Sequence, residues 1–182
     1  HEPNLRWPSF AEAFFQMVAI MDVQRVFFVG SYAGAVPHTR EPRLFCAASN
    51  DALREELKKY DVREVDYEGP GSFTTYLLSR AMERELAMAS LVAEIPAYIQ
   101  GRNPVSIESV TRRLATILGL PTDLSELRSA STEWEAKVSE AVEENDELAD
   151  KIRELEEAYD QDLVDVQTAR GLLDGDSIDP ST

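Results

Sequence analysis

Residues 87–95 read Ala-Met-Ala-Ser-Leu-Val-Ala-Glu-Ile, an apolar run that predicts a buried β-strand. Before this run, Ser72 has the character of an N-cap and begins a predicted helix that extends to about Glu85. After it, residues 104–118 carry apolar side chains at helical spacing and are followed by Gly119, which favours a helix end. Strand and helix therefore alternate around this segment, which is typical of an α/β sheet.

The rest of the first 120 residues continues this alternation. A helix is predicted to start near Pro8, because Phe10, Phe14, Met17, Val18 and Met21 fall on one helix face. Such an order predicts a mostly parallel sheet covered by helices on both faces, which is a three-layer α/β/α domain. Further strands are predicted over residues 25–29, 44–48 and 63–66, and a further short helix over residues 51–60.

The sequence changes character after Pro121. Apolar side chains recur there every three or four positions between mostly Glu and Asp residues, which predicts helix with a narrow apolar seam. Asn145-Asp146 can end one helix and cap the next, so two antiparallel helices folded as a hairpin are expected, and one long helix is the alternative. The seam consists of Leu124, Leu127, Trp134, Val138, Ala141, Leu148, Ile152, Leu155 and Tyr159.

The chain is therefore expected to have three parts. The first is an α/β core domain, the second an acidic helical hairpin with helices at about 123–144 and 146–167, and the third a flexible tail. The expected bounds are 1–120 for the core, 121–168 for the hairpin and 169–182 for the tail.

Acidic side chains are distributed unevenly along the chain. It has 182 residues and a formal net charge of −16; the first 120 residues hold 15 acidic and 13 basic side chains, and the remainder hold 19 and 5. Such a negative chain repels phosphate groups, which disfavours nucleic acid and anionic membranes as partners. No run of about 18 apolar residues predicts a membrane-spanning helix. The single cysteine, Cys46, excludes an internal disulfide and fits a reducing, cytoplasmic location.

The first candidate site is Val36-Pro37-His38-Thr39-Arg40, which follows the first predicted strand. His38 can act there as a general base, or as a donor to a phosphate beside Arg40. The structural alternative is that His38 bonds to backbone groups while Arg40 pairs with Glu41 or Glu94. The other histidine is at the N-terminus, so no histidine-based metal site can be assembled. We predict no metal and no cofactor.

The second candidate site is Glu68-Gly69-Pro70-Gly71-Ser72. A glycine-rich turn that opens a helix presents N–H groups and the positive end of the helix dipole, so Gly69, Gly71 and Ser72 can form an anion site. The stretch is not a P-loop, because no Lys follows it. The alternative is a tight turn with an N-cap, whose role is to reverse the chain.

The third candidate site runs from Glu94 to Asn103. A carboxylate at the end of an apolar strand needs a partner, and Tyr98, Gln100 and Asn103 can line a crevice beside it. Alternatively, Glu94 pairs with Arg40 or Arg102 and fixes the loop. We expect the three loops to converge where parallel strands end, with Arg40 paired to Glu94. No coherent set of catalytic residues stands out.

These loops together resemble the proteasome assembly chaperone 2 family, in its bacterial and archaeal branch. The resemblance is carried by residues 36–40, 68–78 and 93–104, and Leu155-Glu156-Glu157-Ala158-Tyr159-Asp160 resembles the end of that branch's C-terminal helices. The opening stretch, His1-Glu2-Pro3-Asn4-Leu5-Arg6-Trp7, resembles a point in the middle of the family's domain. We therefore expect the parent protein to carry N-terminal strands that complete the sheet.

The resemblance implies an α/β/α domain similar to nucleoside phosphorylases and hydrolases, with C-terminal helices, in a homo-oligomer such as a trimer. Eukaryotic members of the family are chaperones for assembly of the proteasome α-ring. The expected function is therefore non-enzymatic: assembly or protein binding, with the loops and the hairpin as contact surfaces. The alternative is a small-molecule-binding protein, or a hydrolase- or phosphorylase-like enzyme, that uses the crevice around His38, Arg40, Ser72 and Glu94.

Overall fold

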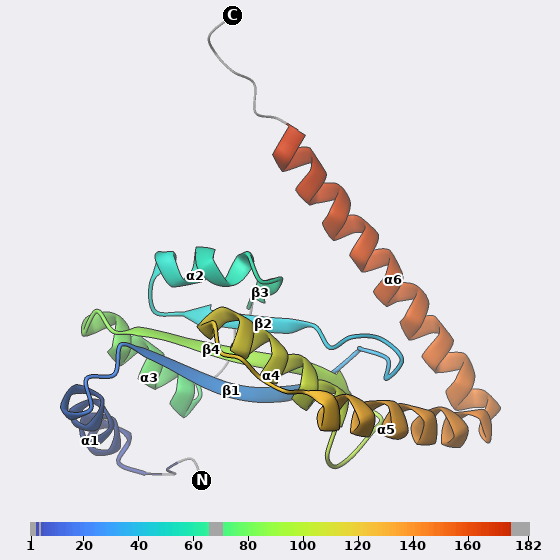
Figure 1. Ribbon diagram of the computed structural model, residues 1–182, viewed down its shortest axis with the longest axis horizontal. Coiled ribbons are helices and arrows are strands. Elements are labelled where there is room, and N and C mark those ends of the chain that lie inside the picture. The colour runs from blue at the N-terminus through green and yellow to red at the C-terminus, as the bar shows by residue number, and fades with distance from the viewer. Residues whose placement is uncertain (1–2, 4, 66–70, 176–182) are drawn as a thin grey trace, which may run out of the picture.

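The protein consists of an α/β body followed by two long helices (Figure 1). The computed structural model describes residue 3, residues 5–65 and residues 71–175, with side chains as far as residue 167. In chain order the elements are α1 (Trp7–Ile20), β1 (Arg25–Gly34), β2 (Leu44–Ala48), α2 (Asp51–Lys58), β3 (Val62–Glu64), α3 (Phe73–Glu83), β4 (Ala87–Pro96), α4 (Pro104–Leu118), α5 (Ser125–Glu143) and α6 (Asp146–Gly175).

The four described strands form one sheet in the order β1-β4-β2-β3. β4 pairs in parallel with β1, with Arg25 opposite Ala87, and β2 pairs in parallel with β3. The third pairing, between β2 and β4, is antiparallel and places Leu44 opposite Ala93. The prediction of a mostly parallel α/β sheet is confirmed. β2 and β3 therefore run opposite to β1 and β4. β2 is reversed relative to β1 because only a short loop without a helix joins them, and a parallel crossover needs a longer connection.

Helices cover both faces of the sheet, so the domain has the expected three layers (Figure 1). On one face α2 and α4 pack over Ala89 and Leu91 of β4, and on the other α1 and α3 pack over Met88. This division follows from the strand period of two, which sends neighbouring residues of β4 to opposite faces. The first core is closed by Leu53, Leu57, Val110 and Ile117, and the second by Ala11, Phe15, Phe73, Leu77 and Ala81.

The inward face of α1 is not the one expected from the spacing. Ala11 and Phe15 are buried against α3, whereas Phe10 and Met17 are exposed. The helix is apolar over much of its circumference, so several stripes have helical spacing, and the position of α3 decides which of them is buried. The second core is built around aromatic rings: Trp7 meets Phe73 edge-on with 5.6 Å between ring centroids.

β1 is longer than the apolar run that predicted it. The strand continues through Gly30 to Gly34 and keeps its pairing with β4 to Pro96. In the described part of the chain, β4 is the one strand beside β1. The further N-terminal strands expected for the parent protein stay a prediction.

The C-terminal part begins and breaks close to the expected positions. The side chain of Asn145 caps α6 by accepting the amide hydrogen of Leu148 at 3.1 Å, so one continuous helix is excluded. α5 packs along α4, and α6 turns back but diverges from α5, so the pair is more open than the expected antiparallel hairpin (Figure 1). The expected tail from residue 169 is helical as far as Gly175, and residues 176–182 lie outside the described residues.

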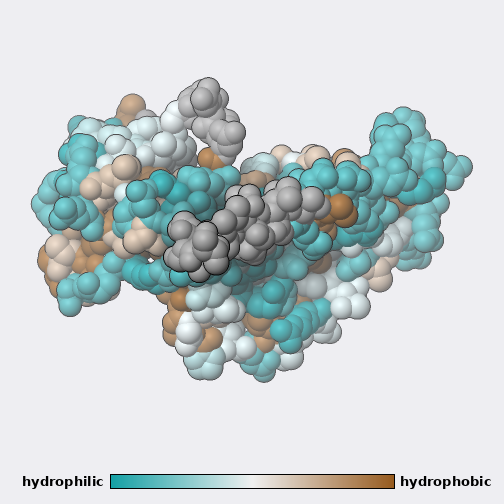
Figure 2. All heavy atoms as spheres, turned by 90° about the horizontal axis from the view of Figure 1, so that it is seen from above, coloured by the Kyte–Doolittle hydropathy of each residue, from teal (hydrophilic) through white to brown (hydrophobic). Residues whose placement is uncertain are grey.

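Most of the predicted seam is sheltered. Leu124, Ile152 and Tyr159 are buried, whereas Ala141 is exposed and its neighbour Val142 is buried in its place. Hydrophilic residues dominate the end of the molecule where α5 meets α6 (Figure 2). No helix in the described part of the chain has the length and apolar character needed to cross a bilayer.

Candidate functional site

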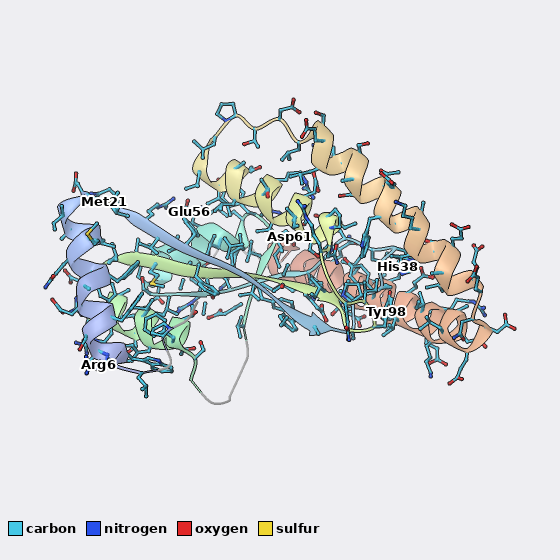
Figure 3. All side chains as sticks on the ribbon, turned by 90° about the horizontal axis from the view of Figure 1, so that it is seen from below. Arg6, Met21, His38, Glu56, Asp61 and Tyr98 are labelled. Atoms are coloured by element: carbon cyan, nitrogen blue, oxygen red, sulfur yellow. The ribbon has the colours of Figure 1, made fainter. Side chains whose placement is uncertain are left out.

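The loop that follows β1 is held deep in the molecule at the carboxyl end of that strand. Val36 is 1% exposed and His38 4% exposed, although this segment has no regular secondary structure. The loop after β4 lies beside it, because β1 and β4 are parallel and end at Gly34 and Pro96, which are paired. Tyr98 of that second loop and His38 point toward one another (Figure 3).

Hydrogen bonds fix both ring nitrogens of His38. The backbone N–H of His38 donates to the Tyr98 hydroxyl at 2.8 Å, and Nδ1 lies 2.8 Å from the same oxygen. The Tyr98 hydroxyl therefore bonds both the backbone and the ring of His38. Nε2 lies 3.1 Å from Ser139 Oγ on α5, within hydrogen-bond distance. Burial lowers the pKa of His38, although Glu135 and Glu156 oppose this, so the neutral ring is favoured.

These hydrogen bonds tie the loop after β1 to the loop after β4 and to α5.

Arg40 does not reach Glu94, so the predicted Arg40–Glu94 pair is wrong. Its guanidinium makes two parallel bonds of 2.9 Å to Asp160 on α6, a bidentate pair. The hydrogen bond from Arg40 lowers the pKa of Asp160. The neighbouring Thr39 hydroxyl donates to Glu156, also on α6. The partners expected for Arg40 were Glu41 and Glu94, whereas its partner lies 120 residues further along the chain.

The partner of Glu94 is Arg43, which sequence reasoning missed. Glu94 is 7% exposed; its Oε2 lies 3.2 Å from Arg43 Nη1, and its Oε1 accepts the amide hydrogen of Ala35 at 2.8 Å. Gly34 makes room for this carboxylate, because a Cβ there would lie 2.3 Å from Glu94 Oε1. Glu94 thus joins the end of β4 to both ends of the loop after β1.

Arg43 also extends this ion-pair network to α6. It bonds Asp162 at 3.1 Å, and its guanidinium lies 4.2 Å from the centre of the Tyr159 ring. Asp162 receives a second bond from Arg63 at 2.8 Å, and the Tyr159 hydroxyl donates to the carbonyl of Glu41 at 2.8 Å. We call these contacts the α6 clasp. It joins Thr39, Arg40, Glu41, Arg43 and Arg63 of the body to Glu156, Tyr159, Asp160 and Asp162 of α6.

The described residues of the second predicted stretch, Gly71 and Ser72, do not join this cluster. β3 runs antiparallel to β4, so β3 ends at the opposite edge of the sheet from β4. Ser72 caps α3 by accepting the amide hydrogen of Thr75 at 3.1 Å, and both Gly71 and Ser72 are exposed. Gly69 lies outside the described residues. Among the described residues, two of the three loops that were expected to converge lie together.

The remaining predicted residues have separate positions. Asn103 caps α4 by accepting the amide hydrogen of Ser106 at 3.0 Å, and Gln100 is exposed on the loop before it. Arg43, Ser139 and Asp162 were absent from the predicted set. The signal that could have found the α6 partners was the stretch Leu155–Asp160, whose carboxylates have the sign needed by Arg40.

A cavity of about 230 Å³ lies on the outer side of His38, lined by Arg40, Glu108, Arg112 and Glu135 among others. Its charges are largely matched: Glu41 bonds Arg112 and Ser109, and these bonds lower the pKa of Glu41 although burial opposes them. No group of three or more potential metal ligands occurs among the described residues.

Comparison with known proteins identifies solved structures that share the fold over most of this chain. A solved Mycobacterium tuberculosis protein of unknown function has a TM-score of 0.82 and 27% identity, covering 94% of this chain and 57% of its own. A proteasome-assembly chaperone homologue from the same organism has a TM-score of 0.72 and 26% identity, with coverages of 83% and 63%. An archaeal homologue of proteasome-assembly chaperone, from Pyrococcus furiosus, shares the fold at a TM-score of 0.61 and 16% identity, with coverages of 81% and 65%.

The chain spans less than two thirds of the length of these solved structures. Comparison with curated proteins gave no match. The model of the PAC2 family matches residues 1–142, which include the α/β body and nearly all of α5. The α/β body, the paired loops and this match together show that the chain belongs to the PAC2 family.

Proposed function

We propose that the chain is a non-enzymatic, protein-binding member of the PAC2 family that helps to assemble a larger protein complex. One observation carries the proposal: the polar residues that could have formed a reactive site are engaged in holding α5 and α6 on the body. His38 bonds Ser139, Arg40 bonds Asp160, and Glu94 bonds Arg43. These side chains therefore hold α5 and α6 on the body and are engaged in bonds that would compete with a catalytic role.

The arm formed by α5 and α6 is the proposed contact surface. Its outer faces carry carboxylates that are largely unmatched by basic residues, because the last 62 residues hold 19 acidic and 5 basic side chains. A partner with a basic surface would be steered to it. Exposed carboxylates of the arm include Glu126, Glu133, Glu140, Glu143, Glu144, Glu147, Asp150, Glu154 and Glu157.

Similarity to a protein described as a proteasome-assembly chaperone homologue supports proteasome subunits as the class of partner. A location in the cytoplasm and self-association, for instance as a trimer, belong to the same proposal. The seam of the arm supports self-association, because Leu127, Trp134 and Val138 stay half-exposed in a single copy. Light scattering at high micromolar concentration should give a mass above 20.4 kDa, and a monomer mass would contradict self-association.

The test of the assembly role uses charge reversal on the arm. Proteasome α subunits of the source organism are mixed with the chain, and ring formation is followed by native mass spectrometry. Glu133→Lys with Glu147→Lys should slow ring formation, because these exchanges reverse two charges of the proposed contact surface. Each exchange also breaks one local ion pair. Glu55→Lys with Glu83→Lys is the matched control, since these residues lose equivalent pairs on the body.

Two outcomes would contradict the proposal. If the wild-type chain leaves the rate and yield of rings unchanged, the assembly role is wrong. If the arm and body variants change ring formation equally, the arm is not the contact surface.

A further inference from the structure

A second cavity, which is lined by no residue of the α6 clasp, lies between the sheet and the start of α4. Its volume is about 360 Å³, which is in the range of small-molecule sites. Val29 of β1 and Ile95 of β4 line it from the sheet, and Ile107 and Val110 line it from α4. The loop Gly101–Asn103 forms its polar end. None of these residues takes part in the α6 clasp.

Ser106, which lines this cavity, has a buried hydroxyl without a partner. Ser106 is 6% exposed, and its Oγ is the one buried side-chain oxygen or nitrogen in the described region that lacks a hydrogen bond. The nearby Ser109 on the same helix donates to Glu41 at 3.1 Å. Buried hydroxyls are nearly always bonded, so this one calls for an explanation. Rotation about a single side-chain bond is enough to turn a serine hydroxyl toward a ligand.

The polar end of the cavity is positive. Arg102 lines it and, among the described residues, makes no ion pair, whereas Arg40, Arg43 and Arg112 are all paired with carboxylates. The N-terminus of α4, a helix of 15 residues, lies at the same place and adds the positive end of its dipole. The amide of Ser106 already donates to Asn103, and Pro104 has no amide hydrogen, so the attraction for an anion comes from Arg102 and from the helix dipole. A negatively charged group is therefore favoured here.

We propose that this cavity binds a small monocarboxylate with a short aliphatic body. The carboxylate would accept bonds from Arg102 and from the hydroxyl of Ser106, which would gain the partner that it lacks. The aliphatic body would lie against Val29, Ile95, Ile107 and Val110. One free guanidinium and one hydroxyl match a single negative charge better than a polyphosphate. This inference is independent of the assembly role.

The test is a titration of the full chain with hexanoate, followed by calorimetry and by ligand-observed NMR. Hexanoate should bind with a Kd on the order of 1 mM, as expected for a ligand of eight heavy atoms. Hexan-1-ol lacks the charge and inorganic phosphate lacks the aliphatic body, so each should bind at least about tenfold more weakly. Absence of hexanoate binding at about 20 mM, or equal binding of hexan-1-ol, would overturn the proposal.

Two variants locate the site. Arg102→Gln should weaken hexanoate about tenfold, and Ser106→Ala about threefold, while Arg153→Gln on α6 is the matched control and should change nothing. Arg102 is exposed, so its loss should not affect folding. Ser106→Ala should keep or raise the melting temperature, because it removes an unbonded hydroxyl. Unchanged affinity in both variants, or a melting temperature that falls by several degrees in Ser106→Ala, would contradict the site.

Discussion

The two C-terminal helices are attached to the same body by different forces. α5 packs along α4 and shelters an apolar seam that begins at the buried Leu124. α6 buries Ile152 and Tyr159, but its polar contacts with the body run through the charges of the α6 clasp. Apolar packing responds little to salt, whereas partly exposed ion pairs are screened by it. The arm therefore combines a firmly attached helix with one whose attachment depends on solution conditions.

The largest effect is expected where the α6 clasp reaches the interior. Arg43→Ala leaves the carboxylate of Glu94 buried without its guanidinium, so the free energy of unfolding should fall by about 3–5 kcal/mol in urea denaturation. Arg54→Ala is the control, because its pairs with Asp51 and Glu64 are exposed, and it should lose about 0–1 kcal/mol. Equal losses in the two variants would show that the Arg43–Glu94 pair is not buried in solution.

The next effect concerns the space beside the same carboxylate. Gly34→Ala places a Cβ against Glu94 Oε1, so the free energy of unfolding should fall by about 1–3 kcal/mol through overpacking. Gly71→Ala is the matched control, since no atom of the described residues beyond its chain neighbours lies within 4 Å of the added Cβ, and its change should stay within about 0.5 kcal/mol. A neutral Gly34→Ala would mean that Glu94 can leave its position without loss.

A smaller effect should separate α6 from α5. Arg40→Ala removes the bidentate bond to Asp160, and amide hydrogen exchange in α6 should become about tenfold faster while exchange in α5 changes little. Raising the salt concentration of the wild-type protein to about 1 M should act in the same direction. Lys137→Ala, which breaks an exposed pair within α5, is the control. Equal acceleration in both helices would argue that the arm opens as one unit.

The smallest effect is a pH dependence at the α5 attachment. Burial lowers the pKa of His38 below its value of about 6.5 in an unfolded chain, so protonation favours unfolding. This contribution to stability is fully present above pH about 6.5 and is lost as the pH falls through the folded pKa. The melting temperature should therefore fall more between pH 7.5 and 5 in the wild type than in His38→Gln. Parallel curves would show that His38 titrates alike in the folded and unfolded chains.

Local sequence signals predicted the elements whose ends are marked by residues that start or stop a helix or strand. The strand Leu44–Ala48 and the helix Pro104–Leu118 have the predicted bounds, and Gly119 ends that helix with a φ of 64°. The inward face of α1 could not be predicted in this way, because its apolar residues surround the helix and only the position of α3 selects among them. The reversed direction of β2 did have a signal, the short helix-free link from β1.

The polar network was harder to predict than the fold. His38, Glu94 and Tyr98 were selected as unusual loop residues, and the structure does place them around the loop after β1. The partners of Glu94 and His38, Arg43 and Ser139, lie 51 and 101 residues away in sequence, and Asp160 lies 120 residues from Arg40. The local sequence around a polar residue does not indicate such a distant partner. Which arginine meets which carboxylate is decided by the sheet register and by the path of α6.

The residues at positions 34 and 94 are coupled, so a substitution at one affects which side chains fit at the other. We expect a side chain at position 34 to lower stability unless the one at position 94 is shortened, because both would occupy the same volume beside the paired ends of β1 and β4. Redesign of this protein should therefore treat the two positions together. A glycine that looks like an ordinary strand end in the sequence thus reserves the place of a carboxylate 60 residues downstream.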